Sequence, residues 1–299
     1  MMKHLSTKIF LGLYLLFTGA IAVNIHIQMA RHGVPFPQWQ PEQWVHVSTL
    51  IIQVLGVVWL SHCIQQWRSS LNYVKHIIVT FVVLAALQEL FIRLPLTAGY
   101  TVDQKYLFLW VHSYLPQLLT CFSIAIGGVT IQRLFTHRME LTYIKKIAVV
   151  FLAMLTISIL EPLFGKIPDY ILPFLTPPSE QGILSMPYPV IVDVIASFTF
   201  IEPMIASFFI CYIIASMKAG SLLSLFLKTT TALLVLTKSG PQLLLYMGIS
   251  TMEPYIVRFL SMAQFTFEWL FIGVVLSITV KYLSKKQFCT KTQFVDRLE

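Results

Sequence analysis

Eight apolar segments divide this chain, and each is long enough to cross the hydrocarbon core of a membrane, which takes about 20 mostly apolar residues. The connections between them are too short to bury a core of their own. With 57% hydrophobic and 11% charged residues, the chain has too little polar surface for a soluble globule. We predict a single all-α transmembrane domain over residues 1–299. Its spans are expected at about 8–30, 45–66, 74–95, 106–132, 144–163, 188–217, 221–249 and 255–282.

The basic residues are concentrated on one side of the predicted membrane. When the amino terminus lies in the cytoplasm, fifteen lysines and arginines and three acidic residues fall in cytoplasmic segments. Six basic and ten acidic residues remain for the outer loops and the spans. This positive-inside pattern predicts a multi-pass protein of the cell (inner or plasma) membrane, with both termini cytoplasmic and a short basic tail over 283–299. The net charge of +8 is thus a topology signal, and we expect no nucleic-acid partner.

The first 22 residues have two interpretations. Lys3 and Lys8, the apolar run that begins at Ile9, and the small residues Ala20 and Ala22 resemble a secretory signal peptide. We favour an uncleaved first span.

Neither the cysteines nor the histidines form a cofactor motif. The four cysteines have no CxxC spacing and lie in predicted spans or in the tail. The histidines at the outer ends of the spans lack the spacing of metal ligands. We therefore expect no cofactor and no metal site.

A lysine interrupts the seventh span in the middle of its apolar run. Lys238 lies in the stretch Thr237–Gln242, with roughly ten membrane-facing residues on either side of it. A charge at that depth requires a partner. Gly240 and Pro241 follow it, and both disfavour a continuous helix. In transporters, helices broken near the midplane expose backbone carbonyls to an ion or a substrate.

Each of the other spans also carries a polar or charged side chain at a similar depth. Counted from the basic residue at the inner end of each span, this layer lies roughly 20–24 Å away. Its members are Asn24, Gln53, Glu89, Gln117, Glu161, Glu202, Lys238 and Glu268. Gln242 and Gln264 lie outward of the layer or at its level, whereas the spans are mostly apolar below it. We predict a polar cavity that opens to the exterior and closes about 20 Å from the cytoplasm.

The predicted layer holds two more acids than bases, once Arg93 is counted with Lys238. Full ionisation would be costly in a low dielectric, so a protonated carboxyl or a bound cation should restore the balance. Glu89 and Arg93 are four residues apart and are expected to pair along one helix face. The leading hypothesis is a proton- or cation-linked transporter or a small-molecule binding protein, with Lys238, Glu202 and Glu268 as its central network.

Two other functions remain open. The charged residues could form a static salt-bridge cluster in a structural membrane subunit. Alternatively, Gln88-Glu89-Leu90-Phe91-Ile92-Arg93, followed by Phe108-xxx-His112, resembles the glutamate and histidine motifs of the CPBP (Abi) family of membrane proteases. That resemblance implies an intramembrane hydrolase in which Glu89 and His112 activate water. We expect membrane lipid and a small molecule or ion as partners, and leave a membrane-protein partner open.

The sequence shows no convincing internal repeat. Three Glu-Pro pairs occur, at 161/162, 202/203 and 253/254, but their flanking residues do not match. If spans one to four and five to eight were related, the two halves would run parallel to each other.

Overall fold

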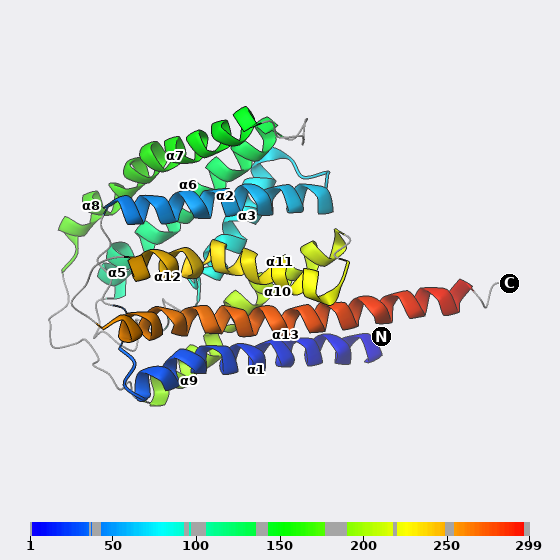
Figure 1. The fold of residues 1–299 in the computed structure, drawn as a ribbon. Coiled ribbons are helices and arrows are strands. Elements are labelled where there is room, and N and C mark those ends of the chain that lie inside the picture. Colours follow the sequence, from blue (N-terminus) through cyan, green and yellow to red (C-terminus); the bar gives the residue numbers. More distant parts are fainter. Residues whose placement is uncertain are drawn as a thin grey trace.

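The chain folds into a bundle of helices (Figure 1). The computed structural model describes residues 2–35, 37, 43–92, 96, 106–135, 143–176, 190–217, 220–248 and 254–295, and it contains no strand over these residues. The predicted all-α fold is confirmed. In chain order the helices are α1 (Met2–Arg31), α2 (Gln43–Trp67), α3 (Tyr73–Leu87), α5 (Tyr106–Leu109), the π-helix η1 (Trp110–Tyr114), α6 (Leu115–Phe135), α7 (Tyr143–Gly165), α8 (Ile167–Ile171), the 3-10 helix η2 (Leu172–Phe174), α9 (Val190–Thr199), α10 (Ile201–Ser216), α11 (Leu222–Leu236), α12 (Ser239–Gly248) and α13 (Tyr255–Val295).

Six or seven stretches of the described chain are long and apolar enough to cross a membrane. Six are continuous: Ile9–Arg31, Gln43–Trp67, Trp110–Phe135, Lys145–Phe174, Asp193–Ser216 and Tyr255–Leu283. The seventh consists of α11 and α12, which are bent by 67° relative to each other. The predicted third span is α3, a helix of only 15 residues. The predicted count of eight full spans is therefore not confirmed.

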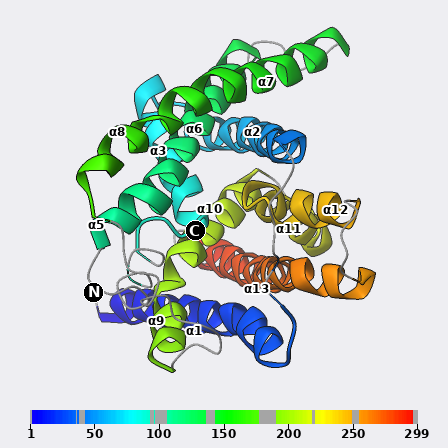
Figure 2. The ribbon, with the colours of Figure 1, turned by 90° about the vertical axis from the view of Figure 1, so that its left-hand side faces the viewer.

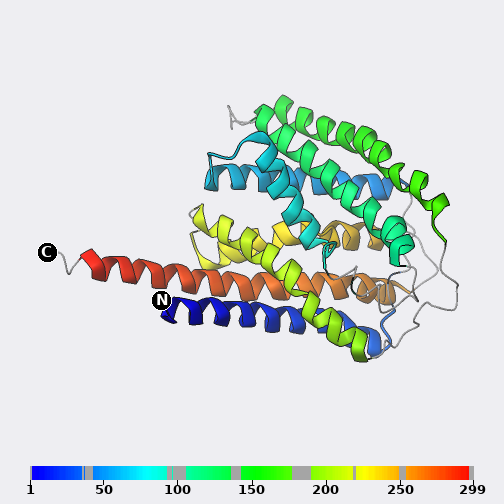
Figure 3. The ribbon, with the colours of Figure 1, turned by 180° about the vertical axis from the view of Figure 1, so that it is seen from behind.

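Both ends of the described chain lie at the same end of the bundle. The start of α1 and the end of α13 point in one direction in Figure 1, and the view from behind in Figure 3 agrees. We call this side the termini end. Both α3 and α11 begin there and stop about halfway along the bundle (Figures 1 and 3).

The first half of the chain, from α1 to α6, and the second half, from α7 to α13, pack in an equivalent way. α2 packs on α3 and α6, and α3 packs on α6; likewise α10 packs on α11 and α13, and α11 packs on α13. α1 contacts α10 and α13 of the second half, while α7 contacts α2 and α6 of the first. This equivalence of contacts is the pattern that a pseudo-two-fold axis along the bundle would produce, with α2 and α10, which contact each other, beside the axis. Seen end on in Figure 2, α7 and α1 accordingly lie at opposite edges.

The local structure of α3 and α11 supports this relation. Each helix has 15 residues. The side chain of Asn72 caps α3 by accepting the N–H of Lys75 at 2.8 Å, and Ser221 caps α11 by accepting the N–H of Ser224 at 3.1 Å. Ser221 follows Asn72 by 149 residues. Equal lengths between equivalent caps make the two helices stop at equivalent depths.

A second pair of contacts repeats at the termini end. Arg133, near the end of α6, donates from Nη2 to the carbonyl of Leu71 at 2.9 Å. Lys281 of α13 donates from Nζ to the carbonyl of Gly220 at 3.0 Å. In each half, a basic residue of the last long helix, α6 or α13, therefore binds the turn that precedes the short helix, α3 or α11.

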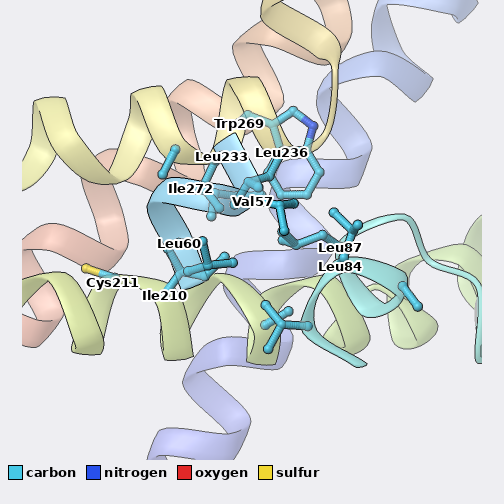
Figure 4. Packing of buried hydrophobic residues seen from close by; sticks show 14 of the residues in the cluster. Val57, Leu60, Leu84, Leu87, Ile210, Cys211, Leu233, Leu236, Trp269 and Ile272 are labelled. Atoms are coloured by element: carbon cyan, nitrogen blue, oxygen red, sulfur yellow. The ribbon is translucent and has the colours of Figure 1, made fainter. Parts of the chain in front are cut away.

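The apolar core fills the bundle between the helix interruptions and the termini end. Figure 4 shows this cluster at close range, with residues from α2, α3, α10, α11 and α13 in mutual contact. Its labelled members are Val57, Leu60, Leu84, Leu87, Ile210, Cys211, Leu233, Leu236, Trp269 and Ile272. Most of the buried side chains in this region are apolar, although buried polar residues such as Ser61 and His76 lie among them.

Glycines allow α11 to approach its neighbours closely. A Cβ on Gly56 of α2 would lie 2.5 Å from Cγ1 of Val235. A Cβ on Gly273 of α13 would overlap the hydroxyl of Thr230 and lie 3.3 Å from its Cα. Small residues at such contacts are typical of helix pairs in membranes, where close packing drives association.

Candidate functional site

The interruption between α11 and α12 is centred on Lys238. α11 ends at Leu236, and Lys238 has a φ angle of 67°, in the left-handed region that side chains rarely adopt. Its N–H donates to the carbonyl of Val235 at 3.2 Å. The predicted break in this span is therefore confirmed, but it precedes Gly240 and Pro241. These two residues lie in the first turn of α12, where a proline displaces no helical hydrogen bond.

The end of α3 has the same backbone form. Glu89 has a φ angle of 62° and is one of only two described non-glycine residues with a positive φ. Its N–H bonds to the carbonyl of Ala86, and the N–H of Leu90 bonds to that of Ala85, both at 3.1 Å. This pair of bonds closes helix C-termini. α3 ends before Glu89, so Glu89 and Arg93 do not share a face of this helix. Arg93 lies outside the described residues, and its pairing with Glu89 stays a prediction.

The two interruptions meet at the carbonyl of Leu236. Nε2 of Gln53, on α2, donates to this oxygen at 2.6 Å, and Nε2 of Gln88, directly after α3, donates to it at 3.0 Å. In an unbroken helix the same oxygen would accept the N–H of residue 240. Two glutamine side chains therefore replace one helical hydrogen bond and hold the ends of α3 and α11 together.

Glu202 holds the chain that follows α3. Its Oε1 accepts the N–H of Phe91 at 2.9 Å, and its Oε2 accepts the N–H of Ile92 at 2.7 Å. The residue is only 6% exposed, so the backbone replaces water around the carboxylate. Glu202 follows Gln53 by 149 residues and takes the equivalent place on α10. The second helix of each half thus binds the interrupted third helix of the other half.

The acids predicted to surround Lys238 are engaged in different places. Glu202 binds the backbone after α3, whereas Oε2 of Glu268 lies 3.3 Å from Nδ1 of His26, between α13 and α1. Lys238 is half-buried at the break between α11 and α12. A network that joins Lys238, Glu202 and Glu268 stays a prediction.

Two other predicted residues lie at helix contacts toward the opposite end of the bundle. Asn24 of α1 donates from Nδ2 to Oγ of Ser197 on α9 at 3.2 Å. Gln264 of α13 donates from Nε2 to the carbonyl of Ser261 at 2.7 Å and to that of Pro35 at 3.3 Å. Both residues tie α1, or the segment after it, to the second half of the chain.

The remaining members of the predicted layer do not form a single ring. Gln117 is exposed and donates to the carbonyl of Ser113 in its own turn, at 2.9 Å. Gln242 is half-buried on α12. The side chain of Glu161 lies outside the described part of the structure. The polar residues therefore gather at two sites, one at the helix interruptions and one between α1 and α13.

His112, which carries the protease resemblance together with Glu89, is exposed on η1. Its ring stacks on Phe108 with centroids 5.6 Å apart, and Nδ1 lies 3.3 Å from Oγ of Ser113. An exposed histidine differs from the enclosed setting in which enzymes activate water. Among the described residues, no three His, Cys, Asp or Glu side chains gather as a metal site.

Sequence reasoning alone missed two parts of this arrangement, the role of Gln88 and the pairing of His26 with Glu268. The signal for Gln88 was the spacing of helix caps: Asn72 and Ser221 begin helices of equal length, so residues 88 and 237 end them. No sequence pattern pairs His26 with Glu268, because 242 residues separate them.

No known protein family, curated protein or solved structure matches this chain. Its function must therefore be argued from the geometry of these two sites.

Proposed function

We propose that this protein is a secondary transporter of a small solute or ion, with its binding site where α3 and α11 end. The observation that carries the proposal is the meeting of two half-length helices at the carbonyl of Leu236, in equivalent positions of the two halves. Transporters built from two related halves bind substrate at broken helices between those halves. Irregular backbone at such a depth is tolerated only where protein buries it or water reaches it.

The chemistry of the two helix ends suits a charged or strongly polar ligand. The C-terminal end of each helix carries a partial negative charge. Glu89 and Lys238 add one ionisable group of each sign at equivalent backbone positions, and both side chains are half-buried. Charges interact strongly with a ligand in such a partly desolvated setting. This pattern favours proton- or cation-linked transport.

The packing of the halves suggests how access could alternate. The apolar core closes the termini end, and it is built from both halves around α2 and α10. Rocking one half against the other about the pseudo-two-fold axis would separate these apolar surfaces and open that end. The carbonyl of Leu236 and its two glutamine donors would remain close to the axis during the motion.

The proposal can be tested without knowing the substrate, by asking from which side the break can be reached. Cys63, Cys121, Cys211 and Cys289 are replaced by alanine, and Ser239→Cys is introduced at the start of α12. Ser239 is 5% exposed, and the change replaces only one oxygen by sulfur. A membrane-impermeant methanethiosulfonate is then applied to right-side-out and to inside-out vesicles. A transporter that alternates should be labelled at residue 239 from both sides.

Met154→Cys in the same cysteine-free background is the matched control. Met154 is 47% exposed on α7, inside a stretch apolar enough to span the membrane, so it should face hydrocarbon and resist the water-soluble reagent from both sides. Labelling of Ser239→Cys from one side only would indicate a binding protein with a fixed opening. Protection from both sides, in folded protein, would indicate a static polar cluster and would refute transport.

A further inference from the structure

The contact between His26 and Glu268 forms a second polar site, apart from the helix interruptions. It lies between α1 and α13, which run side by side in Figures 1 and 3. His26 is 7% exposed and Glu268 is 3% exposed, and Nδ1 lies 3.3 Å from Oε2. The ring of Phe265 packs 5.4 Å from the imidazole ring. An acid and a base are thus held in contact in apolar surroundings.

The face of α13 that carries Glu268 contains buried oxygens without hydrogen-bond donors among the described residues. They are Oγ of Ser261, Oε1 of Gln264 and Oε1 of Glu268, at helical spacings of three and four. The three residues are at most 3% exposed. A buried polar atom left without a partner is costly, so a line of three favours occupation by hydrogen-bonding groups. The line leads from Glu268 toward the end of the bundle opposite the termini.

The elements around this site carry other titratable groups, some of which make contacts elsewhere. Beyond His26 on α1, Arg31 pairs with Asp193 of α9. On α10, Glu202 is bound to backbone N–H groups. Among the residues whose side chains the structure describes, the remaining groups on these elements are Tyr14 of α1, Cys211 and Tyr212 of α10, Lys228 of α11, Lys238 between α11 and α12, Tyr246 of α12, and Tyr255, Arg258, Lys281 and Tyr282 of α13. His26 and Glu268 are thus an acid and a base in contact with each other, with both side chains buried.

We propose that His26 and Glu268 form a proton-binding site, loaded along the oxygens of α13 from the end opposite the termini. With one transferable proton the pair is neutral overall, as imidazolium with carboxylate or as imidazole with carboxylic acid. Release of that proton leaves a single buried negative charge, which is costly unless a cation or a rearrangement compensates it. Binding of a proton here is therefore linked to the charge state of the rest of the bundle.

Among the described residues, the position in the other half that corresponds to Glu268 is not titratable. Lys281 and Arg133 make equivalent contacts and are 148 residues apart. The same offset places Thr120 of α6 opposite Glu268, and a threonine does not titrate in this role. The pseudo-symmetric bundle thus carries this proton site once, which corresponds to one proton per cycle. This last statement rests on the proposed transport, whereas proton binding itself does not.

Infrared difference spectroscopy on the purified full-length protein in lipid nanodiscs tests the site. Spectra at high and low pH should contain the carboxylate and carboxyl stretches of one glutamate in apolar surroundings. Glu268→Gln should remove both signals, and His26→Gln should alter both, because the two groups share the proton. Asp193→Asn changes a carboxylate at a partly exposed pair and should leave them intact. Gln264→Leu should slow hydrogen–deuterium exchange of the carboxyl several-fold.

Spectra of Glu268→Gln that superimpose on those of the unchanged protein would overturn the proposal. If Glu268→Gln is not recovered in folded form, His26→Gln is tested in its place. Spectra of His26→Gln that equal those of the unchanged protein would overturn the proposal as well. Normal exchange in Gln264→Leu would overturn the loading path. If the infrared test fails while Ser239→Cys is labelled from both sides, the protein is a transporter without this proton site. If the infrared test succeeds while Ser239→Cys is not labelled from both sides, the protein binds a proton but does not transport.

Discussion

Replacement of Glu202 by glutamine should destabilise the fold through the backbone of the other half. Glu202→Gln keeps the size of the side chain but turns one oxygen into an NH2 group. That group would face the N–H of Phe91 or of Ile92, so one of the bonds at 2.9 and 2.7 Å is lost. A hydrogen bond to a charged acceptor contributes about 1.5–3 kcal/mol, and a buried N–H without an acceptor costs about 1–3 kcal/mol. Because these losses overlap, we expect the free energy of unfolding to fall by about 2–4 kcal/mol.

Unfolding by sodium dodecyl sulfate in mixed micelles, followed by far-ultraviolet circular dichroism, measures this change. Asp169→Asn is the matched control, because it makes the same chemical change at an exposed residue near the start of α8. It should alter the free energy of unfolding by less than about 0.5 kcal/mol. A Glu202→Gln protein as stable as the unchanged one, or a control that falls equally far, would refute the role given to this carboxylate.

Three further predictions concern the close helix contact, the left-handed turn and the topology. Gly273→Ala should lower the free energy of unfolding by about 1–3 kcal/mol, because the added methyl group would overlap Thr230. Gly12 has no atom within 4 Å of an added Cβ, so Gly12→Ala should not destabilise the protein. The same micelle titration compares the two variants. Glu89→Val should be less stable than Glu89→Gln by at least about 1 kcal/mol in that assay, because a β-branched residue fits a φ of 62° poorly. Equal stabilities of the two variants would contradict the left-handed conformation at residue 89. The positive-inside pattern predicts that both termini lie in the cytoplasm. Green fluorescent protein fused to either terminus should therefore fluoresce and alkaline phosphatase fused there should be inactive; an active phosphatase fusion at one terminus would refute the predicted topology.

The pseudo-two-fold relation explains why two ionisable residues adopt a backbone conformation that usually belongs to glycine. Glu89 and Lys238 follow the last turns of helices with equal length and equivalent N-caps. At each position the left-handed turn costs about 1–2 kcal/mol for a residue with a Cβ. Residues that keep such a cost in the middle of a bundle are candidates for a functional role.

Hydropathy predicted most of the long helices well, because spanning a membrane requires long apolar segments and internal backbone hydrogen bonds. The break at Lys238 was also readable, since a charge and a proline interrupt an apolar run there. The end of α3 was not readable. Residues 74–95 are apolar almost throughout, and the carboxylate that binds Phe91 and Ile92 comes from Glu202, 110 residues or more away.

The predicted polar layer also contains features that the sequence could predict and features that it could not. Depth along each span follows from residue spacing, and Gln53, Glu89, Glu202 and Lys238 do gather at or beside the two interruptions. Rotation about each helix axis does not follow from depth, so Gln117 turned out to be exposed. Glu268 met His26 for the same reason.

The sequence by itself determined that this chain is a membrane-embedded helical bundle, where most of its long spans lie, and that a charge interrupts one of them. It could do so because these properties depend on local composition and on the 1.5 Å rise of a helix. The tertiary structure alone decided that α3 stops halfway, that the ends of two interrupted helices meet at one carbonyl, and that the two halves pack in an equivalent way. Those features depend on which helix faces which, and side chains more than a hundred residues apart set that choice through a few buried hydrogen bonds.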